Sequence, residues 1–354
     1  MSLCLKRLSL LAEALGPNGL AARYWCSIRA SPCSAGHPHL HSVSRPIHLP
    51  PSGALPRVSG SGYQSSGVPI PGPAVAALPD AEQRSRVRRV LERGIHGIAF
   101  SPYLEGQEPG DEISETQIHE RLDVVAPYVR WIRTFSSVEG HEAIPRIAHE
   151  RGIKTLVGVH LDENLDANER QLAAGIEIAQ AGHADILAVG NENLLREDFT
   201  EDQLLGYIER AKAAVPDVPV SFVDAYYLFE QHPAVAQAVD VLLVNCYPYW
   251  ESCPAEYALL YMKEMYRRAQ RAAPGKRVVI SETGWPTSGT PFYAAEPGFE
   301  NAAEYFVRTY QWAEEEGVDI FYFSAFDEAW KVGAEGDVGA FWGLWDQDGT
   351  LKFA

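Results

Sequence analysis

Two carboxylates at the ends of strand-like segments indicate acid–base chemistry. The stretch 185–192 reads DILAVGNE and ends on Glu192, and the stretch 277–286 reads RVVISETGWP and carries Glu282. A carboxylate buried beside apolar residues costs free energy unless something pairs or uses it. Two facing carboxylates can cleave a glycosidic bond, because one protonates the leaving oxygen while the other attacks or assists at the anomeric carbon. The fold must then bring these two strand ends together.

A regular alternation of strand-like and helix-like segments begins near residue 81. We predict strands at 97–103, 130–136, 153–160, 185–191, 218–224, 239–247, 277–281 and 319–326. Amphipathic segments lie between them, and two begin with the spacing of a capping box, at Ser114 with Gln117 and at Thr200 with Gln203. Strands that are apolar on both faces and alternate with helices predict a parallel sheet covered by helices.

The count of these units predicts a TIM barrel, an α/β fold of eight strand–helix repeats, over residues 81–354. A doubly wound open sheet is the alternative. It usually has fewer strands, and the stretch GIAFSPYLEGQEPG lacks the glycine spacing of its phosphate loop. Little helix follows the eighth strand. We expect the amphipathic segment 81–94 to fill that gap, with Val87, Val90 and Leu91 buried.

Residues 1–80 differ in composition from the rest of the chain. They are rich in Ser, Pro, Gly and Arg and show no lasting period of 2 or 3.6, so we interpret most of them as a disordered leader. A signal peptide, an organellar transit peptide and an over-extended reading frame stay open as alternatives. Glu13 interrupts the short apolar stretch, and no convincing cleavage site follows. The histidines of the HPHLH run lack partner carboxylates, which favours a solvated tract over a metal site.

Composition and charge narrow the classes of ligand. The content of 46% apolar and 10% aromatic residues is typical of a globular protein, and no apolar run approaches the length of a membrane span. The formal net charge of −17 repels nucleic acid and anionic membrane surfaces. The five cysteines are too scattered for a disulfide framework. We therefore expect a neutral ligand, no nucleic-acid partner and no membrane span.

In a TIM barrel the catalytic groups lie at the C-terminal ends of the strands. The fourth and seventh strands lie on opposite sides of the barrel, so Glu192 and Glu282 are expected to face each other across its mouth. Taken alone, His160 and Asp224 at other strand ends favour a structural role. Near these ends we find no metal-ligand spacing and no G-x-S-x-G elbow, which favours acid–base chemistry with no metal and no cofactor.

Tryptophans accompany the strand ends. Trp250, Trp285 and Trp330 each follow a predicted strand, and flat indole faces stack on sugar rings. Trp342 and Trp345 lie in the terminal loop, where a packed C-terminal minicore is an equally good interpretation. The aromatic residues thus support a carbohydrate ligand.

Together these motifs resemble glycoside hydrolase family 17, the β-1,3-glucanases and related glucanosyltransferases of the clan A (β/α)8 barrels. The resemblance spans about 95–354 and is carried by AVGNE, ISETGWP, FSPY, IRTFS, YPYW and FDEAWK…GLWD. It implies a β-glucan oligo- or polysaccharide substrate and a retaining double displacement. Glu192 would be the general acid/base and Glu282 the nucleophile, with their carboxyl groups about 5 to 5.5 Å apart.

The resemblance also implies supporting roles for other residues. Asn191 would hold the sugar 2-hydroxyl, and Tyr247 would bond the nucleophile. Glu328 and Lys331 match an acidic and basic pair beside the site, and Asn301 matches a substrate-contacting helix start. Four residues fall where the family places sugar-contacting or supporting groups: Tyr103, Arg133, Trp250 and Trp285.

One position departs from the family pattern. Asn193 follows Glu192, where the family usually has a small apolar residue, and we expect this to alter the hydrogen bonding around the acid. An acid that holds its proton near neutrality needs a pKa raised by burial and by the charge of its partner. Arg133 and Lys331 are expected to keep Glu282 ionised.

Three functions remain open on these grounds. The first is hydrolysis of β-1,3-glucan, and the second is transfer, in which a sugar hydroxyl replaces water in resolving the same intermediate. The third, a non-catalytic glucan-binding barrel, is disfavoured because both carboxylates are present. Endo or exo action, linkage preference and oligomeric state stay open. The substrate class favours an extracytoplasmic or cell-envelope location.

Overall fold

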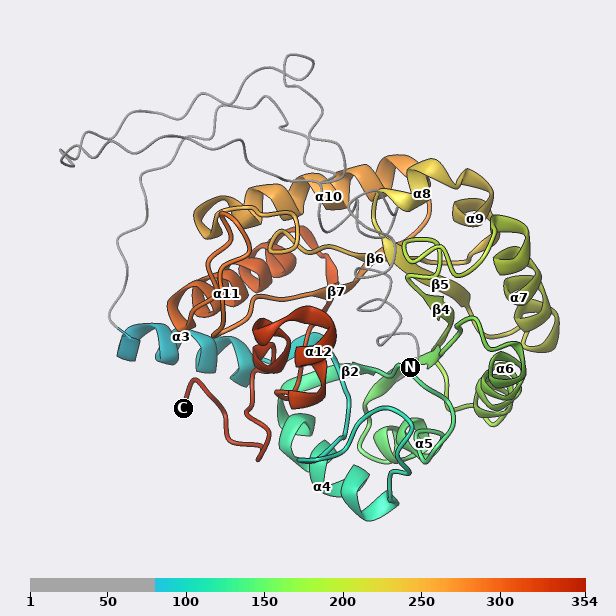
Figure 1. Ribbon diagram of the computed structural model, residues 1–354, viewed down its shortest axis with the longest axis horizontal. Helices are drawn as coiled ribbons and strands as arrows, with labels where there is room; N and C mark the ends of the chain where they lie inside the picture. Colours follow the sequence, from blue (N-terminus) through green and yellow to red (C-terminus); the bar gives the residue numbers. More distant parts are fainter. Residues whose placement is uncertain (1–79) are drawn as a thin grey trace. The chain divides into compact units, whose positions relative to one another are not determined.

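A closed barrel of eight parallel strands forms the centre of the computed structural model, which describes residues 80–354. The labelled strands follow sequence order around the barrel in Figure 1. Each strand pairs with the next until β8 closes on β1. They are β1 (Ile95–Ala99), β2 (Val129–Arg133), β3 (Lys154–Val159), β4 (Ile186–Asn191), β5 (Val220–Ala225), β6 (Leu242–Asn245), β7 (Val278–Thr283) and β8 (Asp319–Tyr322). The predicted TIM barrel is confirmed. The leader predicted at 1–80 lies outside the described residues, apart from Asp80.

Helices surround the barrel, as Figure 1 shows. They are α3 (Asp80–Glu92), α4 (Glu115–Val125), α5 (Ala143–His149), α6 (Leu165–Gln180), α7 (Glu201–Ala214), α8 (Leu228–Gln231), α9 (Pro233–Ala238), α10 (Ala258–Ala272), α11 (Phe299–Glu316) and α12 (Val332–Glu335). Short 3₁₀ turns adjoin several of them, including Ala126–Tyr128 and Ala329–Lys331. Among residues 80–354, no helix combines the length and the apolar character that crossing a membrane requires.

The segment before the first strand completes the helical layer, as expected. Helix α3 packs against α11, which precedes β8, and Val87, Val90 and Leu91 are buried. After β8 the chain forms only short helical turns around α12. The N-terminal helix therefore covers the barrel face that a helix after β8 would normally cover.

The two predicted capping boxes have different outcomes. At α7 the Thr200 side chain accepts the Gln203 N–H, and the Gln203 side chain accepts the Thr200 N–H, so the box is complete. At α4, Ser114 caps the helix through the Gln117 N–H, but the Gln117 side chain donates to the Pro102 carbonyl at 2.8 Å. The second box is therefore only half formed, because the glutamine holds the loop after β1 instead.

The strands end earlier or later than predicted where the loops of the mouth begin. Strand β8 ends at Tyr322, although a strand was predicted to 326. The next residues still donate backbone hydrogen bonds, but to different segments: Phe323 to Thr283, Ser324 to Trp342 and Ala325 to Ala99. Strand β7 runs on to Thr283, so Glu282 lies inside the strand and not after it.

Candidate active site

An amide at the end of β6 links Glu192 to Ser281, the residue before Glu282. Asn245 lies opposite Glu282 in the register of β6 and β7, and its Nδ2 donates to Glu192 Oε1 at 2.8 Å. Its Oδ1 accepts the hydroxyl of Ser281, the residue before Glu282, at 2.9 Å. The side chains from β4 and β7 thus belong to one hydrogen-bonded network over the barrel mouth.

Glu282 is held by a buried cation and a phenol. Arg133, at the end of β2, donates from Nη1 to Glu282 Oε1 at 2.5 Å, and Tyr247 donates from its hydroxyl to Oε2 at 2.7 Å. Burial and the Glu282 charge raise the pKa of Tyr247 well above its ordinary value, so the phenol keeps the proton that it donates. The contact expected between Tyr247 and Glu282 is present.

The guanidinium of Arg133 also bridges to the other strand. Its Nη2 donates to Asn191 Oδ1 at 2.8 Å, and Asn191 directly precedes Glu192. Arg133 is only 2% exposed, so this charge acts with little screening by water. One cation therefore orients one carboxylate and the residue next to the other.

The environment of Glu192 favours its protonated form. Burial raises the pKa of its carboxyl, and the charge of Glu282 raises it further. The hydrogen bond from Asn245 and the charges of Arg196 and Arg133 oppose this shift but do not reverse it. The pKa shift predicted for Glu192 is confirmed in direction and in cause. The site thus contains an acid with a raised pKa and a second carboxylate paired with a cation.

The predicted acidic and basic pair forms beside this network. The Lys331 ammonium pairs with Glu328 Oε2, and both side chains are buried. Trp330 Nε1 donates to the other oxygen of Glu328 at 3.1 Å, and the ammonium lies 4.0 Å from the centre of the Phe323 ring. Arg133, and not Lys331, is the cation bonded to Glu282, and the expected effect of the Lys331 charge on Glu282 stays a prediction.

The candidate sugar-contacting residues differ in exposure. Trp285 is 1% exposed, its Nε1 donates to the Glu296 carbonyl, and its ring packs against Tyr249 and Tyr305. The expectation that Trp285 offers a face to sugar is therefore wrong, because other aromatic rings cover it. Trp250 is half-buried and stays a candidate.

Two further candidates take up supporting positions. Tyr103 is buried, and its ring packs edge-on against His141 and Trp330. Asn301 lies in the first turn of α11, where its Nδ2 donates to the Glu296 carbonyl at 3.0 Å. Trp342 and Trp345 are both buried, as the minicore interpretation requires.

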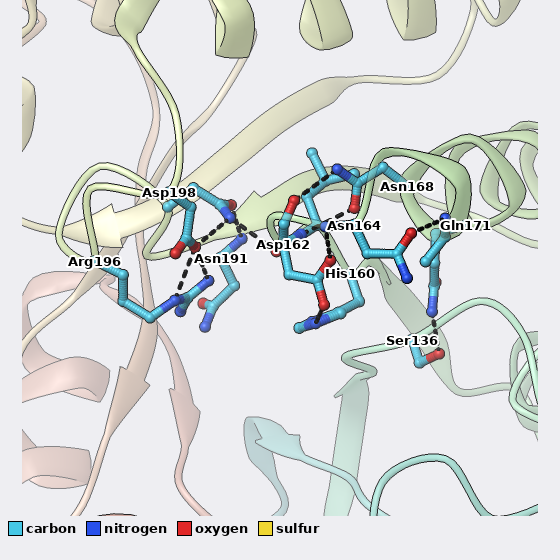
Figure 2. Close-up of polar contacts among 12 residues, drawn as sticks. Ser136, His160, Asp162, Asn164, Asn168, Gln171, Asn191, Arg196 and Asp198 are labelled. Atoms are coloured by element: carbon cyan, nitrogen blue, oxygen red, sulfur yellow. Dashed lines mark hydrogen bonds and ion pairs between the residues drawn. The ribbon is translucent and has the colours of Figure 1, made fainter. Parts of the chain in front are cut away.

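The remaining strand-end candidates contact backbone and loops. Asp224 is fully buried and accepts the backbone N–H groups of Leu194 and Leu195, so it holds the loop that follows the acid. His160 lies 3.8 Å from Asp162, which belongs to the loop after β3 (Figure 2). Both agree with the structural role expected for these residues.

The domain family described as "BtgE/BtgC glycoside hydrolase domain" matches residues 97–343. The chain belongs to this glycoside hydrolase family. It is 28% identical over 260 residues to the glucan 1,3-beta-glucosidase of Arthroderma benhamiae. The alignment covers 68% of this chain and 84% of that protein. It is also 28% identical over 251 residues to the glucan 1,3-beta-glucosidase of Schizosaccharomyces pombe, with 66% and 78% covered.

Solved structures give the same assignment for this O-glycosyl hydrolase. The glycoside hydrolase family 17 beta-1,3-glucanosyltransferase from Rhizomucor miehei is 28% identical, with a TM-score of 0.67 over 74% of this chain and 96% of that one. An active-site mutant of the same enzyme was solved with laminaritriose. An endo-laminarinase from Formosa, at 18% identity and a TM-score of 0.60, shares the fold. The predicted membership of family 17 is confirmed.

Two residues of this hydrolase's site were missed by the sequence reasoning. Asn245 lies within the sixth predicted strand, and nothing in the sequence indicates its link to Glu192. Glu335 lies on α12, and burial raises the pKa of its carboxyl to about 7, although Lys331 opposes the shift. It accepts the indole N–H of Trp342 at 2.8 Å. The short stretch VGAEGD gave no helical period that could have placed Glu335 beside the site.

Proposed function

We propose that residues 81–354 form the catalytic domain of a retaining hydrolase that acts on β-1,3-glucan. The observation that carries the proposal is the paired environment of two carboxylates: Glu282 bound by Arg133 and Tyr247, and Glu192 shifted toward its protonated form. Such a pair divides the roles of acid and nucleophile. The relatives named glucan 1,3-beta-glucosidase support the substrate class.

In the first step Glu282 attacks the anomeric carbon of the bound glucan. The bond from that carbon to the glycosidic oxygen breaks, and the oxygen takes the proton of Glu192 as the leaving sugar departs. Arg133 and Tyr247 orient the attacking carboxylate in advance, so little reorganisation accompanies the attack. The product of the step is a covalent glycosyl-enzyme ester on Glu282.

In the second step Glu192, now ionised, accepts a proton from the incoming nucleophile. Water or a sugar hydroxyl attacks the anomeric carbon, the ester bond to Glu282 breaks, and both carboxyl groups return to their starting forms. Asn191 is proposed to bind the 2-hydroxyl of the sugar, since Arg133 fixes its amide oxygen. Trp250, Tyr103 and Asn301 are proposed as further substrate-binding or supporting residues.

Transfer to a sugar acceptor is the second candidate function. The glucanosyltransferase from Rhizomucor miehei favours it, because this chain spans 96% of that enzyme at 28% identity. Both activities use the same intermediate and the same carboxylates, and they differ in the group that resolves it. An experiment must therefore determine whether water or a sugar hydroxyl resolves the intermediate.

Incubation with laminaripentaose tests both candidates at once. Hydrolysis predicts products shorter than the starting sugar with new reducing ends, whereas transfer predicts oligosaccharides longer than the pentamer. The reaction is run in ¹⁸O-labelled water. Mass spectrometry then measures the fraction of product formed by each route, because only hydrolysis incorporates the label. Cellopentaose, which differs in linkage, serves as the control substrate. Equal cleavage of both pentamers, or no cleavage of either, would contradict the proposed substrate class.

A further inference from the structure

The turn that carries Glu192 has an unusual backbone. Glu192 has φ of +55° and Gly190 has φ of +92°, and the pairing of β4 with β5 shifts register between Ala188 and Asn191. A left-handed conformation is unfavourable for a residue with a β-carbon and persists where the surroundings over-determine it. Something near this turn must therefore hold it in place.

Asn193 supplies that restraint through its side-chain amide. Its Oδ1 accepts the backbone N–H of Asn191 at 3.0 Å, and its Nδ2 donates to the Leu161 carbonyl at 2.8 Å and to Asp198 Oδ2 at 3.0 Å. The side chain is 0% exposed, so every one of these bonds is made away from water. One amide thus joins the loop after β3, the end of β4 and the loop after Glu192.

The partner Asp198 extends the restraint to the backbone of Glu192. Its N–H donates to the Asn193 carbonyl at 2.9 Å, and its carboxylate pairs with Arg196 at 2.8 Å. Arg196 in turn donates its backbone N–H to the Glu192 carbonyl at 2.9 Å. Figure 2 shows the Arg196 side chain directed at Asp198, beside Asn191. These contacts link the residues of the loop to one another and to the backbone of Glu192.

The amide of Asn193 packs closely against the turn. A β-carbon added to Gly190 would lie 2.4 Å from Asn193 Oδ1, so the amide fits against a glycine. A small apolar residue in place of Asn193 would remove the partners of the Asn191 N–H and the Leu161 carbonyl. Buried backbone groups left without partners are costly, so the turn would have to move to satisfy them.

We propose that Asn193 is a positioning residue for catalysis, which fixes the turn so that the Glu192 carboxyl meets the leaving oxygen. The inference rests on the proposed function, in which Glu192 is the general acid. Small misplacements of a catalytic group reduce rate strongly, by about 100-fold for an error on the order of 1 Å. Loss of Asn193 should therefore impair proton donation more than folding or sugar binding.

The loop after β3 offers a matched control. Asn168 is equally buried and makes the same kind of reciprocal amide clamp, accepting the Asp162 N–H at 2.9 Å and donating to the Asp162 carbonyl at 2.8 Å (Figure 2). This clamp adjoins Leu161, an acceptor of Asn193, but the loop that it shapes does not carry the acid. Asn168→Ala should therefore cost stability as Asn193→Ala does, without the same effect on proton donation.

The experiment compares two leaving groups by kcat/KM, which reports the first chemical step. Laminaritriose needs a proton on its departing sugar, whereas a 2,4-dinitrophenyl β-laminaribioside departs without one. We expect Asn193→Ala to lose about 10- to 100-fold on laminaritriose and less than about 3-fold on the aryl substrate. Asn168→Ala should change both substrates equally. Asp198→Ala removes one hydrogen-bond partner of the Asn193 amide. It should show the same selective loss of kcat/KM on laminaritriose, with a smaller fold-change.

The outcomes separate the two proposals. If Glu192→Ala shows the selective loss and both Asn193→Ala and Asp198→Ala lose equally on the two substrates, the positioning role is overturned and the proposed function stands. If Glu192→Ala itself shows no selectivity, the proposed function fails. Should Asn193→Ala not fold, the Asp198→Ala ratio alone decides: a selective loss supports the inference, and an unchanged ratio overturns it.

Discussion

Glu282→Gln should lower kcat on laminari-oligosaccharides by about 10⁴- to 10⁶-fold, the range seen when a member of a nucleophilic catalytic unit is removed. The amide keeps the shape of the side chain and can still contact Arg133 and Tyr247, but it cannot attack the anomeric carbon. Binding should persist, because the sugar-contacting groups are unchanged. Steady-state kinetics and calorimetric titration with laminaritriose measure the two effects separately.

Asp319→Asn provides the control for the Glu282 variant. Asp319 begins β8 at the end of the barrel away from the mouth, and it pairs with Arg277 at 2.6 Å. Its replacement should lower thermal stability while kcat stays within about 2-fold, as expected of a surface ion pair remote from the chemistry. A Glu282→Gln variant that kept more than a tenth of the wild-type kcat would refute the assignment of the nucleophile.

Glu192→Ala should lower kcat/KM on laminaritriose by about 10²- to 10⁴-fold, the contribution typical of a positioned general acid. On a 2,4-dinitrophenyl β-laminaribioside the loss should be far smaller, because that group leaves without a proton. An equal loss on both substrates would mean that Glu192 does not deliver the proton. The control is Glu197→Ala, an exposed carboxylate of the same loop, which should retain wild-type kinetics.

The pH profile of the same variant gives a second readout. The folded protein raises the pKa of Glu192, through burial and the Glu282 charge, so the acid form extends to higher pH than for an ordinary glutamate. In the wild type, kcat/KM on laminaritriose should fall as the pH rises through this pKa. Glu192→Ala has no such group, and its profile should lose that alkaline decline.

The barrel and its carboxylate pair were accessible from the sequence because they rest on local patterns. Apolar runs such as VVIS and ILAVG specify buried strands, and their alternation with amphipathic segments specifies a parallel closed sheet. Once the strand order is known, the ends of β4 and β7 must share the mouth. The prediction of Glu192 and Glu282 as a facing pair therefore rests on strand order together with the residue types at these two strand ends.

The partners of these carboxylates depend on tertiary packing and were harder to predict. Trp285 follows its strand as Trp250 does, yet the neighbouring rings of Tyr249 and Tyr305 cover it. Lys331 pairs with Glu328, one helical turn away, and Arg133 is the cation that pairs with Glu282. Which of several cations reaches a buried carboxylate is set by side-chain directions across the barrel, and a linear sequence does not specify these.

The anomeric form of an azide product tests the double displacement most directly. In Glu282→Ala, azide takes the place of the missing nucleophile and should convert the dinitrophenyl β-laminaribioside into an α-glycosyl azide by one inverting attack. In Glu192→Ala, azide should instead resolve the ester on Glu282 and yield the β-glycosyl azide. Proton NMR of the two products distinguishes the anomers. The reverse pairing of variant and anomer, or a β-azide from Glu282→Ala, would contradict the assignment of Glu282 as nucleophile and Glu192 as acid.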